Sequence, residues 1–144
     1  MQYHTKVISS FREKWTFWDY VVGTNNPIDV WYQSLSDEAQ FLLNNILKDI
    51  SKTEIPIQWG GWRGFLKGQL KSERIWELGF RADKRQYRIF GKFGEQRQVV
   101  LLIGCYHKGP NYTPAEALDT AYKRSKDLRE GRASLNERKI KADF

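Results

Sequence analysis

The chain has 144 residues, of which 40% are hydrophobic and 15% aromatic, so it holds enough apolar material for one domain with a core and is not disordered throughout. The formal net charge is +7, and the single cysteine, Cys105, and two histidines, His4 and His107, exclude a disulfide framework and a zinc site rich in these residues. No run of about 18 apolar residues and no secretory signal is visible, so we expect a cytoplasmic protein without membrane partners.

The first half of the chain predicts a strand followed by two helical segments. Residues 1–14 are polar with scattered apolar positions, which indicates a lead-in segment or a short helix. Residues 15–22 are rich in aromatic and β-branched side chains and predict a strand. Asn26 caps a predicted helix over residues 27–34, whose first position is a proline. Residues 36–50 then show an apolar face at helical spacing and predict a second helix.

The middle of the chain predicts a loop and then three strands. Residues 56–71 hold four glycines among aromatic side chains, which favours a loop that buries its aromatics over a regular helix. Residues 73–80 and 86–93 alternate in hydrophobicity, and residues 98–106 contain a continuous apolar run typical of a central strand. Because the links between these strands are short, we expect an antiparallel meander.

The last part of the chain predicts one more helix and a polar tail. Thr113 and Glu116 have the spacing of a capping box, which predicts a helix that ends near Arg132. Residues 134–144 are polar and are expected to be a loose tail. The predicted order is therefore β-α-α-β-β-β-α, a small α+β domain over residues 15–133 with helices packed on an antiparallel-dominated sheet.

The positive charge is concentrated in the middle of the chain. Residues 71–112 carry nine basic and four acidic side chains, a net charge of +5, whereas residues 1–70 carry seven of each. A basic surface of this kind favours binding to a polyanion such as a nucleic acid, because contacts with phosphates release counterions. The alternative is a soluble protein whose basic surface has no specific ligand.

The sequence lacks the motifs that several kinds of catalysis require. No phosphate-binding loop, dinucleotide fingerprint or nucleophile elbow occurs, and the carboxylates are too scattered for a metal-dependent nuclease. RNA cleavage remains, because the 2′-hydroxyl can be the nucleophile when a base takes its proton and cations stabilise the phosphate. The alternative is that Arg88 and Lys92 are solvated strand residues and Tyr106 belongs to the core, as Cys105 does. The basic and aromatic residues open to the catalytic reading are Arg81, Lys84, Arg85, Arg88, Lys92, Tyr106, His107, Lys108 and Tyr112.

A set of short motifs from Ile75 onward carries a family resemblance. They are Trp76-Glu77-Leu78, Tyr87-Arg88-Ile89, the strand at 99–102, Lys108, Thr113-Pro114, and Glu116 with Ala121 and Arg124. In order and spacing these motifs resemble the RelE/ParE superfamily of bacterial toxins, in particular its HigB-like, phage-derived branch. The resemblance covers about residues 15–133.

The resemblance implies a fold, an activity and a partner. It implies a compact RelE-like toxin with a curved antiparallel sheet and two N-terminal helices. Members of the HigB and RelE branches cleave mRNA in the ribosomal A site without a metal or other cofactor, whereas ParE members inhibit DNA gyrase. Their partner is a small antitoxin protein, which often carries a helix-turn-helix DNA-binding domain.

The resemblance also assigns roles to single residues. Arg88 matches the sheet arginine that faces the phosphate, and Lys108 matches the lysine after the last strand. Gly79 occupies the place of the arginine that follows W-E-L in the family, so Arg81 is expected to replace that arginine. The remaining side chains expected to bind RNA phosphate are Lys84, Arg85 and Lys92.

Three positions depart from the family pattern. Ile103 stands where many relatives have a histidine, and His107 and Gly109 replace the first lysine and the threonine of K-K-T. His107 or Tyr106 is therefore expected to act in proton transfer or base stacking. The sequence predicts a ribosome-dependent mRNA endoribonuclease toxin, with a ParE-like gyrase inhibitor or an inert phage-derived binding protein as alternatives.

Overall fold

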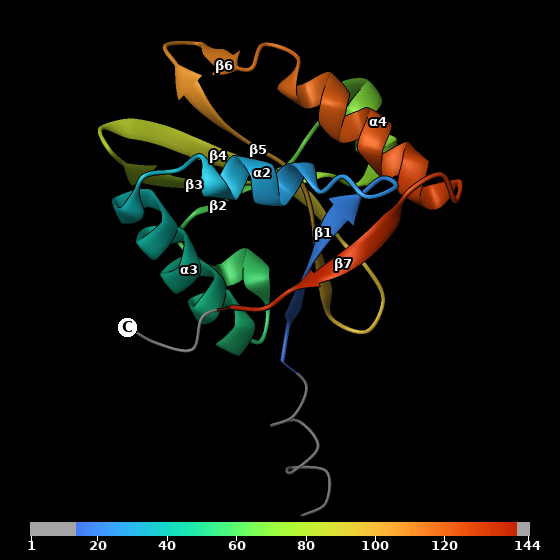
Figure 1. Cartoon of the computed structure of the whole chain (residues 1–144), viewed down its shortest axis with the longest axis horizontal. Helices are drawn as coiled ribbons and strands as arrows, with labels where there is room; N and C mark the ends of the chain where they lie inside the picture. Colours follow the sequence, from blue (N-terminus) through green and yellow to red (C-terminus); the bar gives the residue numbers. More distant parts are fainter. Residues whose placement is uncertain (1–13, 141–144) are drawn as a thin grey trace, which may run out of the picture.

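The computed structural model describes residues 14–140 (Figure 1). The lead-in predicted for residues 1–14 and the end of the predicted tail, residues 141–144, therefore lie outside the described residues, apart from Lys14. The elements are β1 (Thr16–Val21), α2 (Pro27–Gln33), α3 (Asp37–Lys52), the 3-10 helix η1 (Pro56–Gln58), β2 (Trp62–Phe65), the 3-10 helix η2 (Gly68–Glu73), β3 (Trp76–Ala82), β4 (Arg85–Phe93), β5 (Gln98–Lys108), β6 (Asn111–Thr113), α4 (Ala117–Arg129) and β7 (Ser134–Arg138).

The strands form one mixed sheet in the order β2-β3-β4-β5-β1-β7, with β6 paired to β5. The pairing of β1 with β5 is parallel, and all the other pairings are antiparallel. The predicted meander of three strands is confirmed as β3, β4 and β5. Asp83 and Lys84 both have positive φ, which suits the tight two-residue turn that joins β3 to β4. The α+β class and the antiparallel-dominated sheet are thereby confirmed.

Helices α2 and α3 cover one face of the sheet and begin at the predicted caps. The Asn26 side chain accepts a hydrogen bond from the Asp29 N–H (2.9 Å), and the Ser36 hydroxyl accepts one from the Ala39 N–H (3.1 Å). The buried apolar face of α3 packs with Phe17 of β1 and with the inner side chains of the meander, including Trp76. The amphipathic pattern therefore predicts both the helix and the face that it buries.

Helix α4 covers part of the opposite face, where Ala117 and Ala121 pack on Phe90 and on the apolar run of β5. The side chains of residues 99–102 are all buried, because helices cover both sides of β5. The predicted capping box is wrong: Thr113 pairs with Tyr106 as the last residue of β6, and α4 begins only at Ala117. The residue at the cap position is instead Glu116, whose side chain makes no capping hydrogen bond.

Two segments expected to be irregular belong to the sheet. Within residues 56–71, β2 pairs with β3 through a bulge between Trp62 and Gly64, where Gly64 has a φ of +104° that suits glycine. Within the predicted loose tail, residues 134–138 form β7 and run beside β1 (Figure 1). Its pairing with β1 and the ion pairs of Arg138 hold β7, and Leu135 is its one apolar residue, so its polar sequence did not predict a strand.

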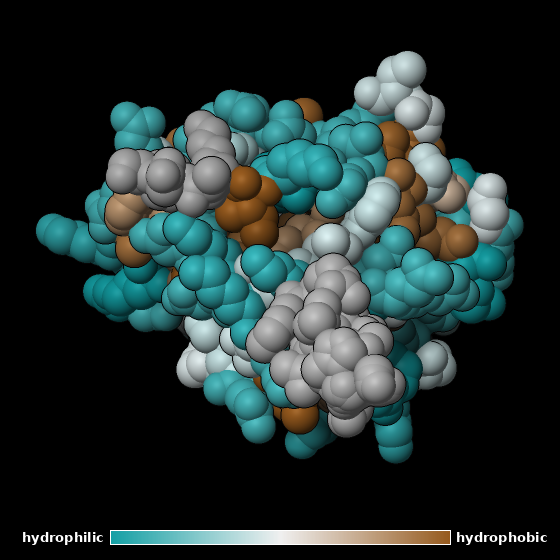
Figure 2. All heavy atoms as spheres, turned by 90° about the horizontal axis from the view of Figure 1, so that it is seen from below, coloured by the Kyte–Doolittle hydropathy of each residue, from teal (hydrophilic) through white to brown (hydrophobic). Residues whose placement is uncertain are grey.

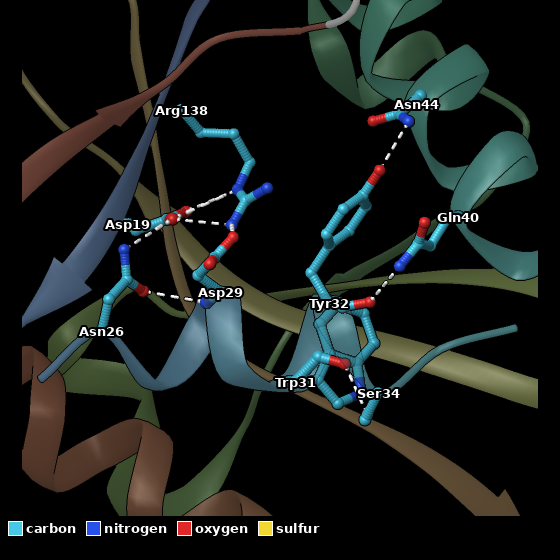
Figure 3. A network of polar contacts seen from close by, with 9 residues as sticks. All are labelled: Asp19, Asn26, Asp29, Trp31, Tyr32, Ser34, Gln40, Asn44 and Arg138. Carbon is cyan, nitrogen blue, oxygen red and sulfur yellow. Dashed lines mark hydrogen bonds and ion pairs between the residues drawn. The ribbon is translucent and has the colours of Figure 1, made fainter. Parts of the chain in front are cut away.

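The ion pairs of β7 meet at Arg138 (Figure 3). The Arg138 guanidinium donates hydrogen bonds to both oxygens of Asp19 on β1 and to Asp29 on α2 (2.9 Å). Asn26 donates to the same Asp19 carboxylate at 3.0 Å. This network joins the last strand to the first strand and to the first described helix.

The face drawn in Figure 2 is mostly hydrophilic, with separate apolar patches. Among the described side chains, the exposed large hydrophobic ones are Val22, Val30, Phe41, Ile55, Ile57 and Phe65. Within residues 14–140, none of the helices combines the length and the apolar character needed to span a bilayer.

Candidate functional site

The sheet separates the predicted site residues onto two faces. Arg88 pairs with Cys105 across β4 and β5, and Gln86 pairs with His107, so Arg88 and His107 share a face. Tyr87 pairs with Tyr106 and therefore shares the other face with it. Because successive side chains of a strand point to opposite faces, Tyr106 and His107 cannot act on the same group.

One group of polar side chains gathers on the face of Arg88, beyond the area that α4 covers. We call it the Arg88 cluster, and its members are Arg63, Glu77, Arg88, His107 and Tyr112. They come from β2, β3, β4, β5 and β6 respectively, so the sheet itself assembles the cluster.

Arg88 and Glu77 form a buried ion pair at the centre of the Arg88 cluster. The Arg88 Nε lies 2.9 Å from the Glu77 Oε2, and the Arg88 Nη1 donates a hydrogen bond to the Tyr87 carbonyl (3.0 Å). Arg88 is only 5% exposed and Glu77 only 9%. The alternative of a solvated Arg88 is therefore wrong. A phosphate can reach its guanidinium only next to Glu77 or by displacing that carboxylate.

His107 lies beside this pair, on the same face of the sheet. Its ring meets the Tyr112 ring edge-on at 4.2 Å between centroids, and its Nε2 is buried without a hydrogen-bond partner among the described residues. Burial lowers the pKa of His107, the positive charge of Arg88 lowers it further, and Glu77 opposes them. A neutral imidazole near pH 7 can accept a proton, as a general base must.

Tyr112 and Cys105 complete this face as protonated groups. The Tyr112 hydroxyl donates a hydrogen bond to the Glu77 Oε2 (3.3 Å), and burial together with Glu77 raises the Tyr112 pKa to about 12. Cys105 is buried, and burial raises its thiol pKa to about 12. The prediction that Cys105 is a small buried residue is confirmed, and at this pKa it is a poor nucleophile.

Arg63 is a member of the Arg88 cluster for which the sequence predicted no role. It lies on the edge strand β2, with its Nε 3.9 Å from the Glu77 Oε2 and its side chain 52% exposed. No motif marked it, because its position depends on how β2 pairs with β3. The one signal in the sequence was a cation within an aromatic, glycine-rich segment that precedes the meander.

Four exposed cations lie at the end of the sheet next to the cluster, and we call them the basic rim. They are Arg81, Lys84, Arg85 and Lys108. The register Arg81–Gln86–His107 puts Arg81 on the face of the Arg88 cluster. Arg85 instead stacks its guanidinium over the Tyr106 ring at 4.5 Å, and alternation puts Lys108 on the side of Tyr106. The expected phosphate-binding residues thus lie on both faces of one sheet end.

Tyr106 lines a small cavity on the face of α2. The cavity measures about 250 Å³, and Arg85, Trp31 and Pro114 contribute to its walls. An aromatic ring with a stacked guanidinium is a suitable surface for a nucleobase. Tyr106 is therefore better placed for base stacking than for proton transfer beside Arg88.

Lys92 is held by α4. Its Nζ donates a hydrogen bond to the Ser125 hydroxyl (2.8 Å), which donates to Glu73 (2.6 Å). Arg129 binds the other oxygen of Glu73 at 2.8 Å, and burial lowers the pKa of Lys92. The predicted phosphate-binding role of Lys92 would break this attachment of α4 to the sheet, so we leave Lys92 out of the candidate site.

Three comparisons with known proteins were used to find the family of this chain. Within residues 14–140, no three His, Cys, Asp or Glu side chains come together as a metal site. A search of curated proteins and a search of solved structures each found no significant match. The family model of the phage-derived protein Gp49-like (DUF891) matches residues 31–126, about two thirds of the chain, which include the whole Arg88 cluster. The chain therefore belongs to the Gp49-like phage-derived family, a family of the RelE/ParE-like toxin type.

Proposed function

We propose that this protein is the toxin of a toxin–antitoxin pair, of the HigB-like kind, and that it cleaves mRNA on the ribosome. The observation that carries the proposal is the position of the His107 imidazole on the same face as the buried pair of Arg88 and Glu77, where burial and the charge of Arg88 lower its pKa. A proton acceptor next to a guanidinium is what cleavage by the RNA's own 2′-hydroxyl requires.

The proposed reaction is an internal transfer of the phosphate. His107 takes the proton of the 2′-hydroxyl, the 2′-oxygen forms a bond to the adjacent phosphorus, and the bond from phosphorus to the 5′-oxygen breaks. The leaving 5′-oxygen takes a proton from Tyr112, whose raised pKa keeps the phenol protonated. Arg88 stabilises the negative charge of the phosphate in the transition state. The products are a 2′,3′-cyclic phosphate and a free 5′-hydroxyl.

The basic rim would guide the message to this site. Its four cations are exposed, and exposed cations attract a polyanion over a range set by the salt concentration. The Tyr106 cavity would receive a base of the same strand. The antitoxin partner would cover the rim with acidic side chains, because charge complementarity speeds and orients association.

The test is the mapping of mRNA cuts by primer extension, with purified protein in the presence and absence of translating ribosomes. The proposal expects cuts only in translated message, and it expects His107→Gln to abolish them while the protein remains folded. Lys52→Ala, which changes an exposed cation at the end of α3, is the control and should cut like the wild type. Equal cutting by wild type and His107→Gln would contradict the proposed site.

One observation favours a second function, inhibition of gyrase without catalysis. Arg88 is buried against Glu77, so its charge is already neutralised in the free protein. A gyrase supercoiling assay separates the two functions. Loss of supercoiling with intact translated mRNA would favour the inhibitor, and no effect in either assay from a folded protein would favour an inert binding protein.

A further inference from the structure

The absence of a side chain at Gly79 makes room for two arginines. A Cβ atom on Gly79 would lie 2.9 Å from the Nη1 of Arg88 and 3.1 Å from the Cδ of Arg63. Gly79 pairs with Arg88 across β3 and β4, so the Arg88 side chain lies over it. Arg63 reaches the same place from the other side, from β2. Any larger residue at position 79 would push the two arginines apart.

The β2 strand is built to hold Arg63 in this position. The Gly79 N–H donates a hydrogen bond to the Gly61 carbonyl (2.9 Å), which fixes the start of β2 directly beside Gly79. The next residue, Trp62, packs on the opposite face, where its ring stacks on Phe93 and contacts Trp76. The register shifts between Trp62 and Gly64, so Arg63 is the extra residue of the bulge. Its approach to Gly79 and to the Glu77 carboxylate places its side chain on the face of Glu77.

The two arginines share one carboxylate. The Glu77 Oε2 lies 2.9 Å from the Nε of Arg88 and 3.9 Å from that of Arg63. Glu77 therefore neutralises one of the two positive charges, and the more distant and exposed arginine keeps its charge for another anion. The positive charge of Arg63 also contributes to the lowered pKa of His107, so the two side chains lie close enough to interact.

We propose that Arg63 and Arg88 together form a binding site for one phosphodiester group of single-stranded RNA, with Arg63 as the solvent-side ligand. This inference rests on the proposed function and assigns the second cation of that site to Arg63 instead of Arg81. The Glu77 carboxylate occupies the space between the guanidinium groups in the free protein and keeps both in place. An arriving phosphate makes its first contact with Arg63, because that side chain is half exposed whereas Arg88 is buried.

The test measures binding of a fluorescein-labelled 2′-O-methyl RNA, which cannot be cleaved, by fluorescence anisotropy over a series of salt concentrations. We expect Arg63→Ala to weaken binding by roughly ten-fold at low salt, since a charge-assisted phosphate contact is lost. The slope of log affinity against log salt should fall by about 0.7, the value for one phosphate of a single strand. Arg63→Lys should keep the slope, because the charge remains.

Two further variants separate geometry from charge. Gly79→Ala removes no charge but displaces the guanidinium of Arg88 and the stem of Arg63, so it should weaken binding with an unchanged slope. Lys67→Ala is the matched control, because it removes an exposed cation from the segment that follows β2. The affinity of Lys67→Ala should stay within about two-fold of that of the wild type, because Lys67 does not belong to the Arg88 cluster.

The outcomes distinguish this inference from the proposed function. If the wild type binds and cleaves RNA but Arg63→Ala binds as tightly with the same slope, the inference is wrong and the proposed function stands. If binding depends on Arg63 but no cleavage of translated message occurs, the inference holds and the proposed function is wrong. If the wild type does not bind the oligonucleotide, the inference is wrong, and the proposed function is then decided separately by the mapping of cuts in translated message.

Discussion

Two buried arginine–carboxylate sites within residues 14–140 differ in charge balance. Arg138 serves two carboxylates, Asp19 and Asp29, and Asp19 also accepts a hydrogen bond from Asn26. In the Arg88 cluster the ratio is reversed, because Arg63 and Arg88 share Glu77. The Arg138 site is rich in acceptors and ties three elements together. The Arg88 cluster has an excess of positive charge, so it has capacity left for an anion.

The two sites also differ in how completely their polar groups are used. The Arg138 guanidinium also lies over the Tyr32 ring at 4.9 Å, so its face as well as its edge is in use (Figure 3). Beside Arg88, by contrast, the Nε2 of His107 is buried without a hydrogen-bond partner among the described residues. Buried polar groups usually have partners, and a ligand or a water could supply the hydrogen bond that this nitrogen lacks.

The largest expected effect on stability comes from Arg138→Ala. Within the network of Figure 3, the change leaves the Asp19 carboxylate, which is 2% exposed, with the hydrogen bond from Asn26. Removing one partner of a buried ion pair costs about 3–5 kcal/mol of unfolding free energy. Denaturant unfolding measures this loss. Under conditions where the variant is folded, its RNA binding should equal that of the wild type, and a selective loss of RNA binding would break the comparison.

Arg88→Ala should have a smaller effect on stability and a larger one on activity. Glu77 keeps the hydrogen bond from Tyr112 and the approach of Arg63, so we expect a loss of about 2–3 kcal/mol. Growth arrest after induction should disappear, because the phosphate loses its inner ligand. Growth assays paired with denaturant unfolding check this expectation. Full arrest by a folded Arg88→Ala protein would remove Arg88 from the site.

Lys92→Met tests the assignment of Lys92 to the attachment of α4. The variant loses the hydrogen bond to Ser125 and leaves Glu73 with Arg129, so a loss of about 1–2 kcal/mol is expected. The affinity for the labelled RNA should change by less than about two-fold, since Lys92 lies outside both the cluster and the rim. A ten-fold weaker affinity with unchanged stability would restore Lys92 as a phosphate ligand.

The smallest expected effect is on the pH dependence of stability. The folded state lowers the pKa of His107 below its ordinary value of 6.5, so between the two values the unfolded chain binds more protons. Stability should therefore fall as the pH drops below 6.5 and level off below the folded pKa. The unfolding midpoint of His107→Gln, followed from about pH 8 to about pH 5, should lack this component. Identical pH profiles of wild type and variant would show that His107 is not perturbed.

Capping preferences and hydrophobic patterns correctly predicted the starts of two helices and the central strand. Asn26 and Ser36 cap their helices as expected, and the continuous apolar run of β5 is buried on both sides. The same rules failed at Thr113, which pairs with Tyr106 of the preceding strand, and at residues 134–138, which pair with β1 from the start of the described chain. Capping preferences and hydrophobic patterns do not encode strand pairing, whether the partner strand is near or far in sequence.

The candidate site was predicted in part for the same reason. Arg88 and His107 were identified as basic and titratable residues near strand ends, but which of them share a face follows only from the register of β4 and β5. Arg63 and Glu77 were not assigned to the site, because their meeting requires the bulged pairing of β2 with β3. Tyr106 was grouped with His107 by sequence proximity, which in a strand implies opposite faces.

The central claim is that the chemistry takes place on the face of His107. The most direct measurement is the rate of cleavage of ribosome-bound mRNA by the wild type, His107→Gln and Tyr106→Phe in single-turnover reactions. The account predicts that His107→Gln loses about 100-fold or more in rate, as expected for a general base, while Tyr106→Phe, which keeps its ring for stacking, cuts like the wild type. The reverse order, with Tyr106→Phe inactive and His107→Gln active, would contradict it.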